Sequence, residues 1–448
     1  MEKQPRNSSI LSIILFVVII SFVYSTQYMI SPNLELISIY FGFGGNTSPL
    51  GVLTFSYTII SGISIIIFGY LADKVIRKWI VFGGSVLFSI FSLLTIFVPS
   101  GFSGYVMFFL LTSVNAIGFG AIIPSIFSLI GDLISQTERS KGFSFFSIAS
   151  LIGTALGLVL ATIAGSIDWR IAYLIAGVAG IITTILILFF REPSRIGKDY
   201  AGMVEEEMVT YSYRIKISDL HEIFQKKSNV WLVINFVDTI PTGIIIFLLF
   251  EYMKQYHNIP NDISLIFLAL ILLSTLIGTI IFGFVGDNLF KKGNKKARVH
   301  LALFGNIFPI PFLFIALLIP FQVADPSSIL NVLSTPGVII WVVLFAVGLF
   351  ANGAVNGNWY ATVADINLPE NRGTVLATTN FFDIIGRAIG PLIGAFVADA
   401  LNYVAGMMMS IIFWIFIPFF WIPVLRNVVD DMTQTQKTFE ERLKDLKS

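Results

Sequence analysis

The stretch Gly69-Tyr-Leu-Ala-Asp73, followed by the basic pair Arg77-Lys78, returns in the second half of the chain. There it reads Gly283-Phe-Val-Gly-Asp287 and is followed by Lys291-Lys292, so the two aspartates are 214 positions apart. In both copies a glycine stands four residues before an acid, and two basic residues follow that acid. Similar sequence at a fixed separation is typical of an internal duplication.

A second set of residues repeats at a single, larger offset. Each member recurs exactly 233 positions later, over a window of 26 residues, which argues against coincidence. Where the first copy has Ser150 and Thr154, the second has Asp383 and Arg387. We expect the shared positions to serve the motion of two related bundles and the differing positions to serve the chemistry. The repeated residues are Asp132, Arg139, Gly153 and Gly157, which return as Asp365, Arg372, Gly386 and Gly390.

The composition excludes an ordinary soluble domain. Of the 448 residues, 56% are hydrophobic and only 12% are charged, whereas a soluble domain has roughly 25% charged residues. Apolar runs long enough to cross a bilayer, about 20 residues each, recur throughout. The sequence predicts an all-α integral membrane protein with twelve transmembrane helices in two pseudo-symmetric six-helix bundles. The predicted spans are 8–30, 50–71, 79–99, 105–134, 142–166, 170–190, 229–252, 263–286, 298–321, 337–363, 373–398 and 404–425.

The basic residues are distributed very unevenly about these spans. Of 28 Lys and Arg residues, all but Arg170, Lys254 and Arg387 fall on one side. Such residues collect in cytoplasmic loops, so the pattern predicts cytoplasmic termini in a multi-pass protein of the plasma membrane. A cleaved signal peptide is an alternative for the first span, but the segment has no convincing small-residue cleavage site. The net charge of +1 gives no indication of nucleic-acid binding, and the lack of cysteine excludes disulfides and thiolate metal sites.

The charge pattern also predicts the domain organisation. We expect an N-terminal six-helix bundle over residues 1–190, a cytoplasmic linker over 191–228, a C-terminal bundle over 229–428 and a cytoplasmic tail over 429–448. Part of the linker, residues 215–227, has an amphipathic pattern suited to the membrane surface, although a solvated linker explains it equally simply. Asn46-Thr-Ser48 is a glycosylation sequon on the predicted outer side.

The first repeat resembles the sequence between helices 2 and 3 of the major facilitator superfamily, G-x-L-a-D-r-x-G-R-[RK], with Ile76 at the second glycine. Thr137-Glu138-Arg139, Pro369-Glu-Asn-Arg372-Gly373 and Arg191-Glu-Pro-Ser-Arg195 also resemble polar turns of that family. The resemblance implies the major facilitator fold and residues that close the cytoplasmic side in one state. Gly69 and Gly283 are expected to allow close helix approach. The gating residues implied in this way are Gly69, Asp73, Arg77, Arg139, Gly283, Asp287 and Arg372.

Span eleven carries two further family resemblances. Gly386-Arg-Ala-Ile-Gly390-Pro391-Leu-Ile-Gly394 resembles an antiporter motif that the family places in helix 5, and here helix 5 lacks the proline. The same stretch resembles the G-D-A-x-S-P pattern of spinster-like lipid transporters, with Arg387 in place of the acid. Independently of the family, small residues four apart allow close packing, and Pro391 is expected to bend the helix.

Three ionisable residues fall deep within predicted spans: Asp238 in span seven, and Asp383 and Arg387 in span eleven. A charge there costs at least about 2.5 kcal/mol, so each is expected to face a cavity or a partner. Asp383 and Arg387 are four apart and can pair along one helix face; such a pair is either functional or only structural. Asp238 is expected to have no partner on its own helix, because positions 234, 235, 241 and 242 are Ile, Asn, Pro and Thr. We therefore predict proton coupling at Asp238 and Asp383, and substrate binding at Arg387.

Other polar and aromatic residues in the spans are candidates for contact with the substrate. The predicted partners are a small organic solute, protons and lipid, with no cofactor, no metal site and a monomeric state. The chain has no Gly-x-x-x-x-Gly-Lys-Ser/Thr loop and no His-Glu-x-x-His motif, so an enzyme is disfavoured. A lipid, amphiphile or drug exporter and a non-transporting sensor of the same fold are the alternatives. The additional substrate-binding candidates are Asn380, Asn235, Asn356, Trp359, Tyr28 and Gln27.

Overall fold

The computed structural model describes residues 6–72, 74–133, 139–192 and 224–445. Residues 6–10, 131–133, 139–147, 369–374, 376, 377, 439 and 442–445 are described by their backbone only. The chain forms two compact units, residues Met1–Thr210 and Tyr211–Ser448. The described part contains twelve helical segments that are long and apolar enough to cross a membrane, which confirms the predicted fold class.

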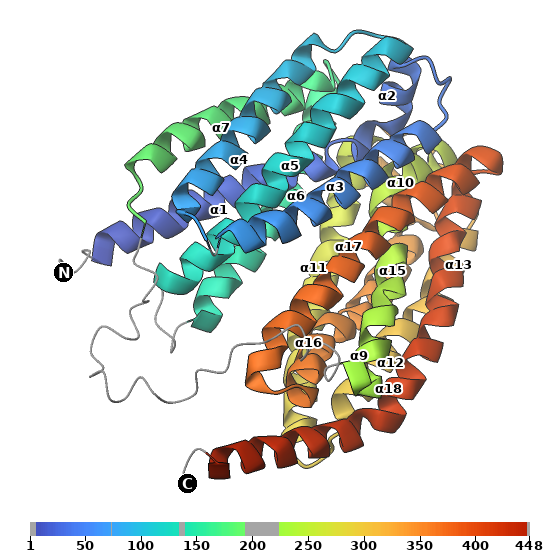
Figure 1. Cartoon of the computed structure of the whole chain (residues 1–448). Helices are drawn as coiled ribbons and strands as arrows, with labels where there is room; N and C mark the ends of the chain where they lie inside the picture. The colour runs from blue at the N-terminus through green and yellow to red at the C-terminus, as the bar shows by residue number, and fades with distance from the viewer. Residues whose placement is uncertain (1–5, 73, 134–138, 193–223, 446–448) are drawn as a thin grey trace. The chain divides into compact units, whose positions relative to one another are not determined.

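The described residues of the first unit form a bundle of six long helices with one short helix on the connection 31–49 (Figure 1). These sequences form helices because the bilayer offers no partner for a backbone N–H or C=O, and a helix pairs both internally. Tyr40, in the short helix, donates its hydroxyl to the Val98 carbonyl at 2.8 Å and so anchors the connection. The helices are α1 (Arg6–Tyr28), α2 (Leu34–Tyr40), α3 (Ser48–Ala72), α4 (Arg77–Leu94), α5 (Phe102–Leu133), α6 (Arg139–Gly165) and α7 (Arg170–Phe189).

In the second unit three of the six spans are interrupted. Span seven consists of α9 (Lys227–Ile234), the short 3-10 helix η5 (Asn235–Asp238) and α10 (Thr239–His257). Span nine divides at Phe308, just before a proline, and span ten divides at Gly353. The remaining helices are α11 (Asn261–Lys291), α12 (Ala297–Ile307), α13 (Pro309–Leu318), α14 (Ile329–Ser334), α15 (Val338–Asn352), α16 (Ala354–Ile366), α17 (Pro369–Ala400) and α18 (Tyr403–Asp445).

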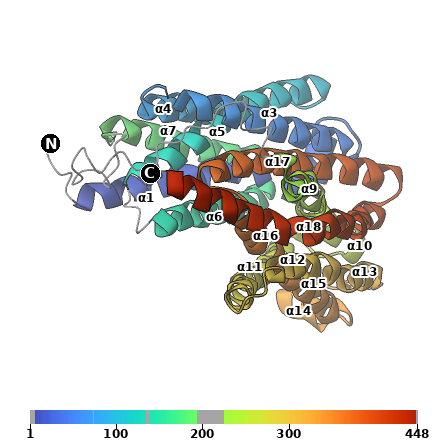
Figure 2. The ribbon, with the colours of Figure 1, turned by 60° about the horizontal axis from the view of Figure 1, so that its bottom comes forward.

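Helix α18 continues well past the predicted end of span twelve. Its buried side extends to Met432 and Thr435, and α9 lies beside it (Figures 1 and 2). The Asp431 carboxylate accepts the backbone N–H of Ser228, at the start of α9, at 3.0 Å. This contact satisfies one of the N–H groups that a helix start leaves without a partner.

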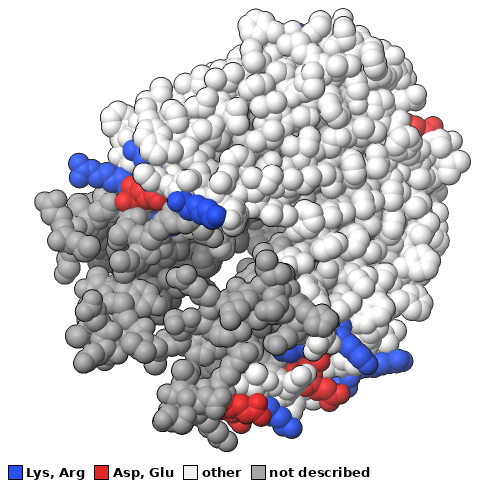
Figure 3. Space-filling model, viewed as in Figure 1, with Lys and Arg blue, Asp and Glu red and all other residues white. Residues whose placement is uncertain are grey.

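On the face drawn in Figure 3, the described Lys, Arg, Asp and Glu side chains lie toward the ends of the helices. In Figure 3 the surface between those ends shows none on the visible face. An uncharged surface of this kind is what contact with the hydrocarbon of a bilayer requires.

The residues repeated at 233 positions make the same kind of contact in both units. A Cβ added at Gly157 on α6 would lie 2.1 Å from the Ser25 carbonyl oxygen on α1. A Cβ added at Gly390 on α17 would lie 2.5 Å from the Ile240 carbonyl oxygen on α10. Only glycine permits these approaches. The duplication therefore preserves a backbone-to-backbone packing of spans one and five and of spans seven and eleven.

Candidate functional site

The break in span seven places Asp238 at the end of the short helix η5. Pro241 explains the break, because it has no N–H and its ring crowds the carbonyl four residues earlier, at position 237. Residues three apart align on a 3-10 helix, and the Asn235 side-chain amide donates to Asp238 Oδ2 at 2.8 Å. Asp238 was expected to lack a partner on its own helix. That expectation is wrong, because it considered charges and overlooked a neutral amide.

Span eleven packs directly against this break. Thr239, the residue after Asp238, donates its hydroxyl to the backbone carbonyl of Asp383 at 3.0 Å. A Cβ added at Gly386 would lie 2.3 Å from the Phe236 carbonyl oxygen. The structure therefore brings the helix segments that carry Asp238 and Asp383 together within one unit, although the two residues are 145 positions apart in the sequence.

The predicted polar stripe on α17 joins a second helix. Asn380 accepts the hydroxyl of Tyr360, on α16, at 3.0 Å between the two oxygens. Asn380 and Asp383 are partly exposed, and Arg387, one turn further along the same face, is exposed. The side chains at the exposed end of this stripe are accessible to a ligand.

The other candidates of the second unit differ in accessibility. Asn356, on α16, is exposed, whereas Trp359 is buried with its ring edge-to-face against Tyr360 at 4.8 Å between centroids. Asn235 is also buried. The contact of Trp359 is thus with Tyr360, and the contact of Asn235 is with Asp238.

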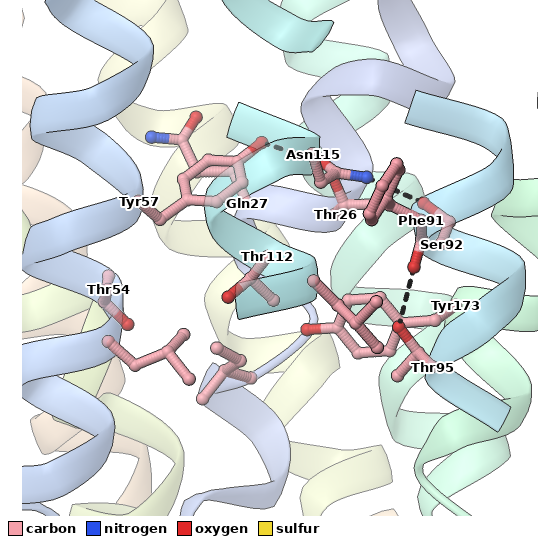
Figure 4. A pocket seen from close by; sticks show the side chains of 13 residues that line it. Thr26, Gln27, Thr54, Tyr57, Phe91, Ser92, Thr95, Thr112, Asn115 and Tyr173 are labelled. Carbon is pink, nitrogen blue, oxygen red and sulfur yellow. Dashed lines mark hydrogen bonds between the residues drawn. The ribbon is translucent and has the colours of Figure 1, made fainter. Parts of the chain in front are cut away.

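In the first unit Gln27 lines a small internal cavity (Figure 4). Asn115 lies at its wall, donates to the Ser92 hydroxyl at 2.8 Å, and has the hydroxyls of Thr26 and Tyr57 at 3.5 Å from Oδ1. The free space is about 10 Å³, which is room for roughly one water molecule. Tyr28, the other candidate here, is the partly exposed last residue of α1 and is not among the residues lining the cavity.

Among the expected gating residues of the first unit, only Arg77 has a described side chain that carries charge. It is buried, its Nε lies 2.9 Å from Glu192 Oε1, and its Nη1 donates to the Ser128 hydroxyl at 2.9 Å. The Glu192 carboxylate also accepts the backbone N–H groups of Arg77 and Lys78. Asp73 lies outside the described residues, and the side chains of Arg139 and Arg372 are not described.

The second unit has a related charge cluster. Arg298, at the start of α12, donates to Asp287 at 2.6 Å through Nη2 and to Asp365 through Nη1. Asp287 and Asp365 both belong to the sequence repeats, so one arginine connects the two repeated acids of this half. Sequence reasoning did not single out Arg298, because its partners come from two other helices.

The packing expected at Gly69 and Gly283 is not found. A Cβ added at Gly69 would meet the Pro124 Cβ at an ordinary 3.7 Å, and one added at Gly283 would meet nothing within 4 Å. The expectation of close helix approach at these two glycines is therefore corrected. Close approach occurs instead at the glycines repeated at 233 positions.

A comparison with known protein families shows which family the chain belongs to. Residues 16–338 match the family model described as Major Facilitator Superfamily, which is more than half of the chain. The chain belongs to the major facilitator superfamily. It is a multi-pass membrane protein of a transporter family, as the sequence motifs implied.

Sequence relatives of this facilitator include spinster proteins. The spinster protein of Drosophila melanogaster is 27% identical over 350 residues, which cover 75% of this chain and 53% of the relative. The sphingosine-1-phosphate transporter of Xenopus tropicalis is 26% identical over 361 residues, covering 75% of this chain and 64% of the relative. The matches thus span less than two thirds of these relatives' lengths. They confirm the resemblance to spinster-like transporters.

Solved structures agree on the fold of the facilitator. A bacterial homologue of the human lysosomal transporter spinster has a TM-score of 0.75 at 16% identity, covering 96% of this chain and 99% of that one. A D-xylose–proton symporter has a TM-score of 0.65 at 17% identity, covering 91% of this chain and 96% of that one. At such identities the likeness concerns the fold alone.

Two buried polar groups of the facilitator were missed by sequence reasoning. Glu251, on α10, is 1% exposed inside an otherwise apolar run. His257, at the end of α10, is fully buried, and its ring nitrogens lie 2.9 Å from the Tyr252 hydroxyl and from the Phe321 carbonyl oxygen. Glu251 could have been identified from the sequence as a single acidic residue near the end of a span. Nothing in the spacing indicated that a loop would cover His257.

Proposed function

We propose that this facilitator is a secondary active transporter that moves a small organic solute by alternating access, coupled to protons at Asp238 and Asp383. Arg387 and Asn380 contact the solute in this proposal, together with Asn356 on α16 of the same unit. Asn235 and Trp359 position the site residues Asp238 and Tyr360, which they contact. The protein acts as a monomer in the plasma membrane with both termini in the cytoplasm, as the distribution of basic residues favours.

The observation that carries the proposal is the pairing of Asn235 with Asp238. A side-chain amide has a donor end and an acceptor end, whereas an ionised carboxylate only accepts and a protonated one also donates. In the orientation described, the amide Nδ2 donates to Asp238 Oδ2, and Asn235 Oδ1 is buried with no hydrogen-bond partner among the described residues.

A rotation of this amide by half a turn exchanges its two ends. The Oδ1 atom would then accept a proton carried by the Asp238 carboxyl group, at the same 2.8 Å separation of the heavy atoms. One neutral neighbour thus accommodates the charged and the neutral carboxyl group. A lysine or arginine partner would instead favour the charged form alone. This property suits a carboxyl group that binds and releases a proton during transport.

Arg387 supports an anionic group on the solute. It is exposed and one turn from Asp383 on α17, so its guanidinium is placed to exchange a carboxylate of the protein for one of a ligand. The gating role of Asp73, Arg77, Arg139, Asp287 and Arg372 remains part of the proposal.

A second candidate function is the transport of a lipid or amphiphile. It is favoured by one sequence relative, which is a sphingosine-1-phosphate transporter. Such a solute also carries an anionic group, so Arg387 serves both candidates. The two candidate functions are distinguished by the class of solute that binds to the site, which is short and polar for the first and long-chained for the second.

The experiment that tests the proposal is a thermal-stabilisation screen of the purified protein with organic anions and amphiphiles at pH 5.5 and 7.5. A substrate is expected to raise the unfolding temperature of the wild type in a pH-dependent manner, and Arg387→Ala is expected to abolish that rise. Asp238→Asn is expected to retain binding but lose its pH dependence. If the Asp238→Asn variant keeps the full pH dependence, proton coupling at this residue is wrong.

A further inference from the structure

An apolar groove runs along the surface of the first unit between α1 and α7. Its volume is about 690 Å³, in the range of sites that enclose small ligands. The walls come from the first half of α1 and the second half of α7, which lie near each other at the end of the unit that carries the N-terminus (Figure 1). The apolar lining residues are Leu11, Ile14, Leu15, Val18, Leu186, Phe189 and Phe190.

The depth of the groove distinguishes it from a merely apolar surface. Phe190, which lines the groove, is buried, and its ring lies edge-to-face against that of buried Phe16 at 5.1 Å between centroids. Leu11 and Phe189, which also line the groove, are 67% and 79% exposed. Exposed apolar residues are ordinary on a membrane protein, but a concave channel between two spans holds a hydrocarbon chain along its length instead of touching it from one side.

A cation stands at the end of the groove. Arg191, two residues after the end of α7, lines the groove and is exposed. Its side chain makes no hydrogen bond or ion pair with any residue that the structure describes. The neighbouring acid does not neutralise it, because the Glu192 carboxylate is bound by the Arg77 side chain and by two backbone N–H groups. Lys78 adds a second positive charge nearby, with Nζ donating to the Leu188 carbonyl at 2.8 Å.

We propose that this groove binds one acyl chain of an anionic phospholipid from the surrounding bilayer, with the lipid phosphate held by Arg191. The apolar walls match the chain, and the guanidinium matches the phosphate, to which it can donate two parallel hydrogen bonds. In the orientation proposed above, this end faces the cytoplasmic leaflet, and basic pockets between spans on that side are suited to anionic headgroups. The site is independent of the solute and of proton coupling.

The charge of the lipid headgroup decides which phospholipid of the bilayer the groove prefers. A zwitterionic phospholipid offers the same chains and also a phosphate, but its own ammonium or choline group competes for that phosphate. Phosphatidylglycerol offers the phosphate without a competing cation. The groove should therefore distinguish these two lipids, whereas a purely apolar groove should not.

Native mass spectrometry of the full-length protein in detergent tests the proposal. Phosphatidylglycerol and phosphatidylcholine with identical chains are titrated against the wild type, Arg191→Gln and the matched control Arg426→Gln, an exposed arginine on α18. The wild type is expected to bind phosphatidylglycerol more tightly. Arg191→Gln should weaken that binding about fivefold, equivalent to about 1 kcal/mol for one basic residue near a headgroup, while Arg426→Gln should leave it unchanged.

Two further arms identify the occupant. Leu15→Trp places a larger side chain in the groove and should weaken the binding of both lipids, and Val18→Trp serves if the first variant does not fold. Inorganic phosphate should not displace phosphatidylglycerol. The proposal is overturned if the wild type binds both lipids equally, if Arg191→Gln binds like the wild type, or if phosphate displaces the lipid and the tryptophan variants bind normally.

Discussion

The repeated glycines give the sharpest stability prediction. In Gly157→Ala the new Cβ would lie 2.1 Å from the Ser25 carbonyl oxygen, and in Gly390→Ala it would lie 2.5 Å from the Ile240 carbonyl oxygen. Since atoms of backbone cannot rotate away, the paired helices must separate. Overpacking of this kind costs about 1–3 kcal/mol, and the better helix propensity of alanine returns up to about 1 kcal/mol. Each variant should therefore lose about 1–2 kcal/mol.

Thermal unfolding of purified protein measures this loss. A change of 1 kcal/mol shifts the midpoint by about 2–4 °C in a unit of this size, so each variant should unfold roughly 2–8 °C below the wild type. Gly83→Ala on α4 and Gly357→Ala on α16 are matched controls, one per unit, because an added Cβ meets nothing within 4 Å at either. Their midpoints should stay equal or rise. Equal midpoints for Gly157→Ala and its own control would refute the packing argument.

Three other predictions concern polar contacts outside the bundle centres. Hydrogen bonds from the Arg170 side chain hold the pKa of Asp168 below its usual value, so the pair should contribute stability above about pH 4 and lose it as the pH falls further. In Asp168→Asn, the free energy of unfolding should fall less between neutral and acidic pH than in the wild type, by less than about 1 kcal/mol. An unchanged fall at acidic pH would contradict this. Arg298→Gln leaves Asp287 and Asp365 without their shared partner and should cost about 2 kcal/mol in chemical denaturation; wild-type stability would contradict that. Asp431→Ala removes the acceptor for the first turn of α9 and should cost about 1 kcal/mol, whereas Asp431→Asn should cost less because it can still accept; equal losses would contradict the capping role.

The duplication and the twelve spans could be read from the sequence because they depend on local properties. An apolar run of sufficient length has few alternatives to a helix in a bilayer, and a glycine pair repeated at one offset marks the same contact in both halves. The interruptions were harder to place. In span seven the proline is at position 241, whereas the irregular residues are Asn235–Asp238, since a proline disturbs the turn that precedes it.

The partners of the charged residues could not be read from spacing. Asp287, Arg298 and Asp365 come from three helices, and Glu192 meets Arg77 across 115 positions. Sequence patterns identify residues that need a partner, because a buried charge is costly, but only the packing of the helices selects which partner is near. The proximity of Asp238 to span eleven likewise could not be read from the spacing of the residues.

The central claim, that Asp238 carries a coupling proton, is tested most directly by flux in proteoliposomes. An imposed pH gradient should drive concentrative movement of a solute identified in the stabilisation screen, and a protonophore should abolish it. Asp238→Asn should lose the gradient-driven movement while retaining exchange of the solute between equal concentrations, and Arg387→Ala should lose both. Gradient-driven movement at the wild-type rate in both variants would contradict the account.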